Sequence, residues 1–380
     1  MSYIRKSIRF VLVVAAMMSG LQLFGRGDDD PDIDNLHLEM MEAAGIEAPV
    51  AGNNSGDNYS FEYVNTLTGK APYRKARRGI MIVGRGDTLR ALEPFRGSSE
   101  RACTYASVIN TYAEKLGPKV RVYCMPVPVP VAYYCPDEAA ANAKNVRRQM
   151  IEIFSNLSPD VEPVDIYPTL ALHVNEPIYS RTDHHWAPLG AYYASGCFAE
   201  SAGVDFFDLS AYERHDKPGY VGTMYKFSGD PAVKRAPETF TYYTPVDSNY
   251  SVTYTVYTLD KARLNVIDES SPISGSFFQS ASGSATYLTF MGGDTRLTCI
   301  DSGVDTPRRL AIVKDSYGNA IPPYLIGSFN QIHVIDCRYF TKNILDYIND
   351  NGITDLLFVN NMSHAVNPRT SDTLLRYLNQ

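Results

Sequence analysis

The segment best suited to acid–base chemistry is Asp-His-His-Trp, at residues 183–186. Imidazole gains and loses a proton near neutral pH, and a carboxylate is the usual group that orients it. The spacing of Asp183 and His185 lets the carboxylate bond one ring nitrogen and leaves the other nitrogen free for a serine. His184 could take the same role, although its side chain should project differently. Such a pair still needs a nucleophile from elsewhere in the chain.

Ser316, far downstream, is the best candidate for that nucleophile. It follows a predicted strand and precedes Gly318, which indicates a turn from a strand into a helix. Backbone N–H groups at the start of such a helix could stabilise an oxyanion. The alternative is that Ser316 is only a helix N-cap, a position that serine favours for hydrogen bonding alone. Thr88 is a less favoured nucleophile, and Gly-x-Ser-x-Gly is absent.

Metal and nucleotide chemistry find less support in the sequence. A zinc site at Asp183, His184 and His185 would need ligands from other segments, and His-Glu-x-x-His is absent. Four further histidines are scattered along the chain, at His173, His215, His333 and His364. A glycine-rich stretch begins at Gly84 but has Leu89 where a nucleotide loop needs its third glycine. We therefore expect neither a metal nor a cofactor.

The composition is that of a folded protein with no general attraction to nucleic acid. The chain has 380 residues, 44% of them apolar and 20% charged, and a net charge of −7. Tyrosine is common, with 27 residues against a single tryptophan. Tyrosine suits contacts with sugars, because the ring stacks and the hydroxyl forms hydrogen bonds. The alternative is that these tyrosines simply fill β-strands.

The N-terminus predicts export from the cell. Basic residues precede an apolar stretch at residues 10–24 that is short for a membrane-spanning helix. We interpret residues 1–25 as a signal peptide or signal anchor, and residues 26–75 as a largely irregular tether. The expected location is the periplasm or cell envelope, with membrane contact only through the N-terminal segment. The six cysteines fit an exported protein with some disulfides, and the alternative is buried free thiols.

From residue 76 to residue 380 an α/β pattern predominates. Strands are predicted at 79–84, 119–124, 163–167, 310–314, 332–336 and 355–359, and helices at 99–116, 137–157, 188–203 and 341–351. Residues 212–302 alternate as antiparallel strands do, at 239–243, 251–258 and 285–290, so we expect a β-rich insertion there. Alternating strands and helices imply a parallel sheet, with the site at the carboxyl ends of its strands. Ser316, Arg338 and Asn360 each lie just past such an end.

Several blocks of the chain resemble the bacterial DHHW family. Residues 180–193 are similar to its signature, and residues 222–225, 314–320 and 334–340 resemble other shared blocks. Residues 290–294 resemble a further block, in which we expect asparagine rather than Asp294. DHHW proteins resemble the SGNH-hydrolase-like O-acetyltransferases of alginate and other exported polysaccharides. The resemblance implies a flavodoxin-like parallel sheet with helices on both faces.

The same resemblance implies roles for particular residues. Ser316 would be the nucleophile, His185 the general base and Asp183 the group that orients the base. Oxyanion or substrate contacts would come from the serine N–H, from Cys337 or Arg338, from Asn360 or Asn361, and from Tyr317, His184 and Trp186. The serine block here is Lys-Asp-Ser-Tyr rather than Gly-Asp-Ser, and no Gly-x-Asn-Asp block occurs.

The predicted function is acyl chemistry, with acetyl as the expected group, on a cell-surface polysaccharide or peptidoglycan. The protein would act as a transferase or an esterase through an acyl-enzyme. Its partners would be that glycan and an acyl donor, which a membrane-bound donor protein could supply. The alternative is a non-catalytic glycan-binding or envelope assembly protein on the same scaffold.

Overall fold

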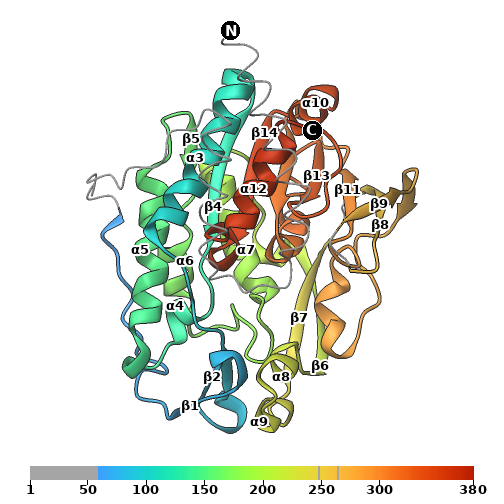
Figure 1. The fold of residues 1–380 in the computed structure, drawn as a ribbon. Coiled ribbons are helices and arrows are strands. Elements are labelled where there is room, and N and C mark those ends of the chain that lie inside the picture. The colour runs from blue at the N-terminus through green and yellow to red at the C-terminus, as the bar shows by residue number, and fades with distance from the viewer. Residues whose placement is uncertain (1–58, 247–248, 263–264) are drawn as a thin grey trace.

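The computed structural model describes residues 59–380 except 247–248 and 263–264 (Figure 1). The expected signal segment at 1–25 and most of the expected tether lie outside these residues. The tether was expected to continue to residue 75, but the chain is already packed from Tyr59, whose ring stacks on Phe154. Arg147 also donates to the backbone carbonyls of Tyr59 and Phe61. Among the described residues, no helix is long and apolar enough to cross a membrane.

Five parallel strands form the centre of the main sheet. Their spatial order is β13 (Gln331–Asp336), β12 (Arg309–Lys314), β14 (Asp355–Asn361), β4 (Arg121–Val127) and β5 (Val161–Pro163). Their carboxyl ends lie along one edge of the sheet, because parallel strands run in the same direction. The expected parallel core is therefore present, although β5 is shorter than predicted. The last strand in the chain, β14, lies at its middle.

The β-rich insertion extends this sheet, which is therefore mixed rather than purely parallel. β11 (Arg296–Asp301) pairs antiparallel with β13, and β8 (Ser251–Leu259) pairs antiparallel with β11. β9 (Val266–Glu269) and β10 (Ile273–Gly275) both pair with β8, which completes a nine-stranded sheet. β11 covers the edge of β13 that would otherwise expose unpaired N–H and C=O groups. Separately, β6 (Tyr212–Tyr220) and β7 (Glu238–Pro245) form a two-stranded ribbon.

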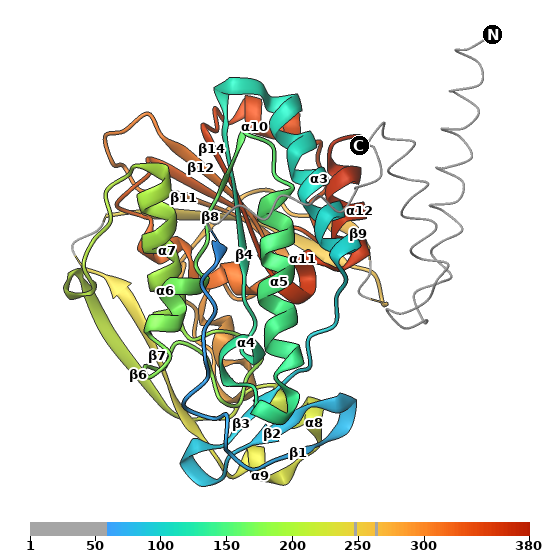
Figure 2. The same ribbon diagram turned by 90° about the vertical axis from the view of Figure 1, so that its left-hand side faces the viewer.

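Helices cover both faces of the parallel strands, as expected (Figure 2). On one face, Tyr112 of α3 (Ser99–Leu116) packs edge-on against Phe358. On the other, Phe198 of α7 (Pro188–Ala202) packs against Tyr123. Phe358 pairs with Cys124, the neighbour of Tyr123, so the two ring contacts lie on opposite faces. The other helices of the parallel unit are α4 (Val131–Tyr134), α5 (Ala141–Ser155), α6 (Tyr167–Leu172), α10 (Ile344–Asp350), α11 (Met362–Ala365) and α12 (Pro368–Tyr377).

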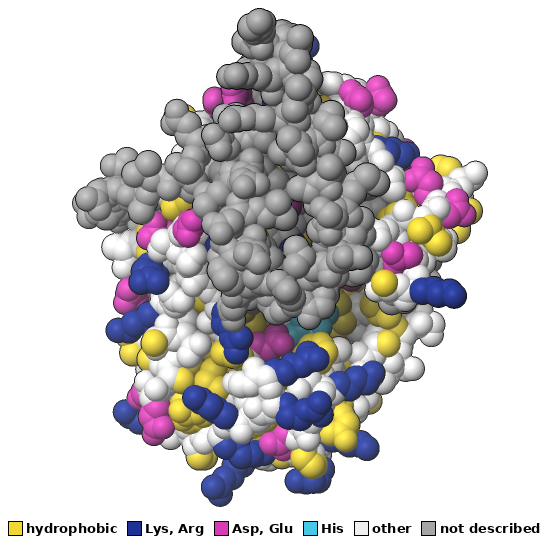
Figure 3. All heavy atoms as spheres, in the orientation of Figure 1, with side chains coloured by type: hydrophobic (Ala, Val, Ile, Leu, Met, Phe, Trp, Pro, Cys, Tyr) yellow, Lys and Arg dark blue, Asp and Glu magenta, His cyan; other side chains and the backbone are white. Residues whose placement is uncertain are grey.

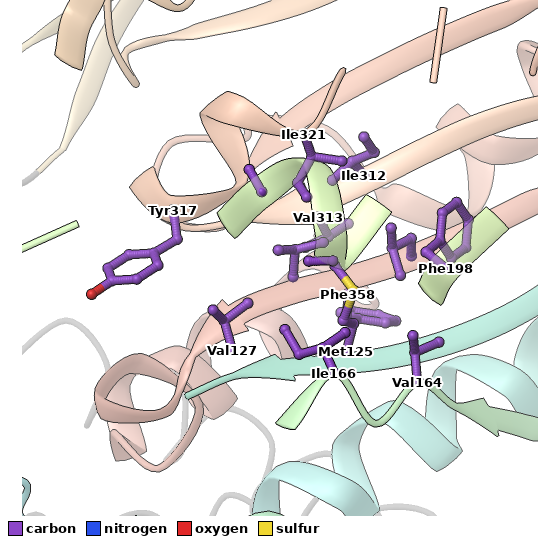
Figure 4. Packing of buried hydrophobic residues seen from close by; sticks show 14 of the residues in the cluster. Met125, Val127, Val164, Ile166, Phe198, Ile312, Val313, Tyr317, Ile321 and Phe358 are labelled. Carbon is purple, nitrogen blue, oxygen red and sulfur yellow. The ribbon is translucent and has the colours of Figure 1, made fainter. Parts of the chain in front are cut away.

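The core is continuous between the sheet and these helices. Figure 4 shows part of it, with Tyr317 at one end of the cluster, Phe198 of α7 at the other, and Met125 and Val127 of β4 between them. Tyr317 immediately follows Ser316, so the core anchors the backbone at the predicted nucleophile. All six cysteines are described and free, which makes the expectation of disulfides wrong. Four of them are buried, namely Cys103, Cys124, Cys135 and Cys337.

A small lobe with its own hydrophobic cluster stands beside the main sheet. β1 (Tyr73–Lys75), β2 (Met81–Val83) and β3 (Arg90–Leu92) form an antiparallel three-stranded sheet. It packs on α8 (Met224–Ser228) and α9 (Pro231–Lys234) through Ile80, Ile82, Leu89, Ala91, Met224, Val233 and Ala236. The prediction that residues 79–84 belong to the parallel sheet is therefore wrong. That apolar run is buried against α8 and α9 instead.

Two further local predictions are corrected. Residues 285–289 lie in the 3₁₀ helix η8 (Gly283–Thr289) rather than in a strand. Residues 163–167 span the end of β5 and the start of α6. The predicted helices at 99–116 and 188–203 are confirmed, since α3 and α7 end at Gly117 and Gly203, both with positive φ.

Candidate active site

Ser316 lies directly after β12 on a turn that is held by Asp315. The structure has a short 3₁₀ helix there, η9 (Ser316–Ala320), in place of the predicted α-helix start. Asp315 is the N-cap of this helix and accepts from the N–H of Tyr317 at 2.8 Å, so the reading of Ser316 as the N-cap is wrong. Ser316 is partly exposed while its neighbours Asp315 and Tyr317 are buried. The turn therefore presents a hydroxyl to solvent on a rigid base.

The imidazole of His185 lies within hydrogen-bond distance of that hydroxyl. His185 Nε2 is 2.8 Å from Ser316 Oγ, and His185 Nδ1 is 2.6 Å from Asp183 Oδ1. With Asp183 ionised, Nδ1 carries the proton and donates to the carboxylate, which leaves Nε2 to accept from the serine. The structure thus brings together residues 131 positions apart in the chain in the order serine, imidazole, carboxylate. This order is the arrangement that activates a serine.

Asp183 is held as a buried anion by several donors. Its Oδ2 accepts from the N–H of Thr223 at 2.7 Å and from Thr223 Oγ1 at 2.8 Å. Burial by itself would raise the pKa of this carboxyl, but His185 and these hydrogen bonds hold the pKa of Asp183 well below its usual range. Gly222 lets its backbone pass close to Asp183, because a Cβ at residue 222 would overlap the side chain of Asp183. The segment 222–223 therefore fixes the acid.

The loop that leads to Asp183 is organised by Glu238, at the start of β7. The carboxylate of Glu238 accepts from Ser180 Oγ at 2.6 Å and from the N–H of Thr182 at 2.8 Å. It also accepts from the N–H of Arg181. Three consecutive residues are thus tied to one carboxylate just before the acid.

Aromatic side chains lock the ring of His185 and join the two halves of the site. Tyr287 of η8 stacks on His185 with ring centroids 3.8 Å apart and planes 7° from parallel. Its hydroxyl donates to the carbonyl of Tyr317 at 3.0 Å, and Trp186 Nε1 donates to the same carbonyl at 2.9 Å. The hydroxyl of Tyr317 in turn donates to the carbonyl of His184. Trp186 and Tyr317 are both buried, so they hold the loop of His185 and the turn of Ser316 together.

His184 occupies a neighbouring but different position from His185. Its Nδ1 is 2.7 Å from Thr223 Oγ1, and its ring lies beside that of His185. Burial, together with the positive charge that His185 can carry, lowers the pKa of His184 to about 3. His184 is therefore neutral at physiological pH. Its side chain is 27% exposed, which leaves it available to a bound substrate.

The two asparagines that were expected as oxyanion donors are distinguished by the structure. Asn361 donates from its N–H and its side chain to Asp315 Oδ2, at 2.7 and 3.1 Å, and its Oδ1 caps α11. Asn360 is fully buried, accepts from Tyr105 at 2.7 Å, and faces Cys337 Sγ at 3.7 Å. The N–H of Cys337 donates to the carbonyl of Lys314. None of these donors is free at the surface.

Two of the expected donors remain. The N–H of Ser316 has no acceptor among the described residues. The guanidinium of Arg338 is one-third exposed and is held by Asp336 through Nε and Nη2, both at 2.8 Å. Arg338 also reaches Asp294 at 2.9 Å. Of the expected donors, the Ser316 amide and the partly exposed Arg338 side chain are therefore the two that the described residues do not fully engage.

Asp294 stands where the family pattern led us to expect asparagine, and it joins a buried charge cluster. It accepts from Lys314 Nζ at 3.2 Å and from Asn319 Nδ2 at 2.8 Å. Lys314 is also 2.6 Å from Asp336. Although burial opposes it, the charges of Lys314 and Arg338 hold the pKa of Asp294 well below its usual range. This cluster lies under the serine turn and fixes Arg338.

Asp183, His184 and His185 are also the one group of three in the described ranges that could together offer ligands to a metal ion. One ligand atom from each residue lies within 4.8 Å of the others. Both oxygens of Asp183 and Nδ1 of His185 are, however, already hydrogen-bonded to each other or to Thr223. The arrangement suits the movement of a proton better than the binding of a metal.

Sequence reasoning missed Thr223, Glu238 and Tyr287, and it assigned no role to His364, which lies near enough to His184 to affect its pKa. Thr223 lies in a block that resembled the family, and that resemblance was the available signal. The rival nucleophile Thr88 is in the small lobe, where its hydroxyl bonds the carbonyl of Arg85.

A model of the family described as DHHW protein matches residues 82–335. The chain belongs to the DHHW family. A DHHW protein from Eubacterium siraeum DSM 15702 has a similar structure, with 38% identity and a TM-score of 0.71. The match covers 79% of this chain and 96% of that one. The family predicted from residues 180–193 is thereby confirmed.

More distant structures are similar to this DHHW protein as well. Bacillus cereus PatB1, solved with a sulfonyl adduct, has 20% identity and a TM-score of 0.59, and the match covers 77% of this chain and 96% of that one. The O-acetyltransferase domain of Pseudomonas putida AlgJ has 13% identity and a TM-score of 0.41, with 80% and 99% covered. PatB1 shares the mixed α/β fold. A comparison with curated proteins finds no match.

Proposed function

We propose that this DHHW protein is a serine-dependent acyltransferase or esterase that acts on O-acyl groups, most naturally acetyl, of a cell-surface polysaccharide or peptidoglycan. The observation that carries the proposal is the contact of 2.8 Å between Ser316 Oγ and His185 Nε2, with Asp183 on the other side of the ring at 2.6 Å. Catalysis by a general base requires this hydrogen-bond reach. A glycan-binding protein without catalysis would not need it.

In the proposed reaction, Ser316, His185 and Asp183 each have one role. Ser316 Oγ attacks the acyl carbonyl while its proton passes to His185 Nε2, and Asp183 stabilises the imidazolium. The oxyanion of the tetrahedral intermediate would meet the Ser316 N–H and the Arg338 guanidinium. The intermediate collapses to the acyl-enzyme as the leaving alkoxide takes the proton from His185. A sugar hydroxyl or water then repeats the sequence in reverse, with His185 again as the base.

The order of the parallel strands supports an SGNH-like assignment. If the strands are numbered from β12, which leads into Ser316, then β12, β13, β14, β4 and β5 become strands 1 to 5. Their spatial order in the sheet is then 2-1-3-4-5. That is the order of the flavodoxin-like fold. The fold is then a circular permutation in which the base and acid precede the nucleophile. Numbering that begins at β4, the first parallel strand in the described part of the chain, does not give this order.

The acyl group and the cellular location are proposed from the similar proteins and from the N-terminal sequence. AlgJ, one of the similar proteins, is described by an O-acetyltransferase domain, and PatB1 carries a sulfonyl adduct. We propose that the chain is exported to the periplasm or cell envelope, where its N-terminal segment provides the membrane contact. The acyl group would come from a donor that a membrane-bound protein supplies.

A p-nitrophenyl acetate assay tests the proposal. Wild-type protein should release p-nitrophenol, and Ser316→Ala should lower kcat/KM about 1,000-fold or more, because the nucleophile is lost. A sulfonyl fluoride should inactivate the wild type and add one sulfonyl group, detectable by mass spectrometry. The Ser316→Ala protein should remain unmodified.

Thr88→Ala provides the matched control, since Thr88 is an exposed hydroxyl outside the site. Its kcat/KM should equal that of the wild type. Equal turnover by wild type and Ser316→Ala, with circular dichroism unchanged, would contradict the proposal and favour a glycan-binding protein.

A further inference from the structure

The small lobe beside the site is strongly basic, although the whole chain has a net charge of −7. We call residues 73–92 and 223–236 the basic lobe. Residues 73–92 include six basic residues and one acidic residue, Asp87, and residues 223–236 include three basic residues and one acidic residue, Asp230. Arg90 is half-buried, and the other eight basic residues are Arg74, Lys75, Arg77, Arg78, Arg85, Lys226, Lys234 and Arg235.

These cations are exposed, and most of them are not neutralised by a partner. All eight are exposed to solvent. Arg74 pairs with Asp230 at 2.5 Å, and this is the one ion pair within 4 Å that the eight make among the described residues. In Figure 3, Lys and Arg side chains gather over the lower part of the molecule, where Figure 1 places β1, β2, α8 and α9. The lobe therefore presents a positive surface on which, among the described residues, seven of the eight exposed cations form no ion pair.

The basic lobe is joined directly to the loop that carries the catalytic acid. On one side, the N–H of Ala91 donates to the carbonyl of Arg181 at 2.9 Å. On the other, the N–H of Met224 donates to the carbonyl of Thr182 at 3.0 Å, and Thr223 binds Asp183. The two segments of the lobe thus border residues 181–183 from both sides. A ligand held on the lobe would extend to the triad.

A short chain of contacts links the positive surface to His184, whose ring lies beside that of His185 in the triad. The guanidinium of Arg78 lies over the ring of Phe227, 5.1 Å from its centroid, and that ring is 5.7 Å from the ring of His184. Arg78 has a φ of 58°, an uncommon backbone conformation for a side chain of this size. One carboxylate, Glu93, follows β3 at the border between the lobe and the site.

We propose that the basic lobe is the docking surface for the acceptor or substrate polymer, and that this polymer is an anionic glycan whose repeating units carry carboxylate or phosphate groups. The inference rests on the proposed function and narrows its substrate class. Exposed cations at one surface attract a polyanion by their summed field, and the attraction weakens as salt screens it. A neutral glycan would gain nothing from this surface.

Binding of three defined polymers to the full-length protein tests the inference. The polymers are polygalacturonate, which carries carboxylates, poly(glycerol phosphate), and neutral dextran, and binding is measured by isothermal titration calorimetry at low and high salt. At least one polyanion should bind about tenfold or more tightly than dextran and should lose affinity as salt rises. The polyanion that binds more tightly identifies the anionic group.

The triple variant Arg77→Glu, Lys226→Glu, Arg235→Glu should weaken polyanion binding about tenfold or more. It should leave the kcat/KM for p-nitrophenyl acetate unchanged, because that ester is neutral and small. The matched control is Lys115→Glu, Lys119→Glu, Arg121→Glu, which reverses three exposed cations near the amino end of β4, opposite the site. The control should bind the polyanion as the wild type does.

Dextran binding equal to that of both polyanions, or unchanged polyanion binding in the lobe variant, would overturn the inference. The same measurements distinguish a failure of the docking surface from a failure of the proposed function. Polyanion binding without turnover that depends on Ser316 contradicts the proposed function, whereas such turnover without any preference for polyanions contradicts the docking surface alone.

Discussion

At the scale of single residues, Thr223 is the side chain that sequence alone would not have placed in the site. It donates twice to Asp183 Oδ2, from its N–H and from its hydroxyl, and the same hydroxyl lies 2.7 Å from His184 Nδ1. The backbone donor survives any substitution, but the hydroxyl does not. Thr223 is therefore a positioning residue whose contribution can be isolated.

Thr223→Val should lower kcat for p-nitrophenyl acetate about tenfold, because Asp183 loses one hydrogen bond to its charged form, worth about 1.5–3 kcal/mol at most. Thr223→Ser keeps the hydroxyl and should retain most of the activity. The measurement is steady-state kinetics on both variants. Equal kcat for the valine and serine variants would show that the hydroxyl does not support the acid.

The contact of Asp183, His185 and Ser316 could be predicted, because residue type and local spacing indicate which side chains can form such a chain of hydrogen bonds. Asn360 and Asn361 could not be told apart, since adjacent residues on a strand face opposite sides and the facing side depends on the neighbours. Asn361 is engaged by Asp315 and by the cap of α11. The cap is local, but the contact with Asp315 joins residues 46 positions apart, and no local pattern predicts it.

At the scale of elements, η8 shows how an alternating pattern can mislead. Residues 285–290 alternate as a strand does, yet residues 285–289 lie in a 3₁₀ helix with Thr286, Tyr287 and Thr289 buried. In a 3₁₀ helix, residues three apart share a side, which places Thr286 and Thr289 together. Tyr287 then projects onto His185. Tertiary contacts, not local pattern, decide this element.

Substitutions at Tyr287 separate its two contributions. Tyr287→Phe keeps the stacked ring and loses only the hydrogen bond to the carbonyl of Tyr317, so activity should be largely retained and stability should fall by about 1 kcal/mol. Tyr287→Ala removes the ring from His185 and should lower kcat about tenfold or more. Kinetics and urea unfolding provide the two readouts. Equal kcat for all three proteins would show that stacking does not position the base.

At the scale of the whole molecule, His333 makes stability depend on pH. It is buried between β13 and α10, with Nδ1 2.6 Å from Tyr347 OH. Burial, aided by the charge of Arg309, lowers the pKa of His333 to about 4. Its folded pKa is below its ordinary value, so the unfolded chain binds the additional proton. Stability is therefore full above about pH 6.5 and is lost as the pH falls towards 4.

The free energy of unfolding should decrease between pH 7 and pH 5, with His333 contributing on the order of 2 kcal/mol to the decrease. His333→Gln should remove that share of the decrease, although its stability at pH 7 should be lower than that of the wild type. Urea unfolding at both pH values measures the difference. The same decrease in wild type and variant would show that His333 does not titrate as described.

The parallel α/β unit could be predicted from sequence, because each strand and helix has its own apolar period and its own caps. The pairing of strands could not, since β11 joins β13 through contacts that no local pattern encodes. The short apolar run at 79–84 likewise fits a buried strand in either sheet. Partner choice is a property of the assembled molecule.

The position of β14, between β12 and β4, has a consequence for biosynthesis. A ribosome completes β4 and β5 long before it translates the two strands that separate them from β13. Until residue 361 emerges, β4 has no inner neighbour, and the nascent N-terminal portion exposes apolar surface that a chaperone could recognise. Asp183 and His185 are likewise synthesised about 130 residues before Ser316, so their contact with its hydroxyl forms only near the end of translation.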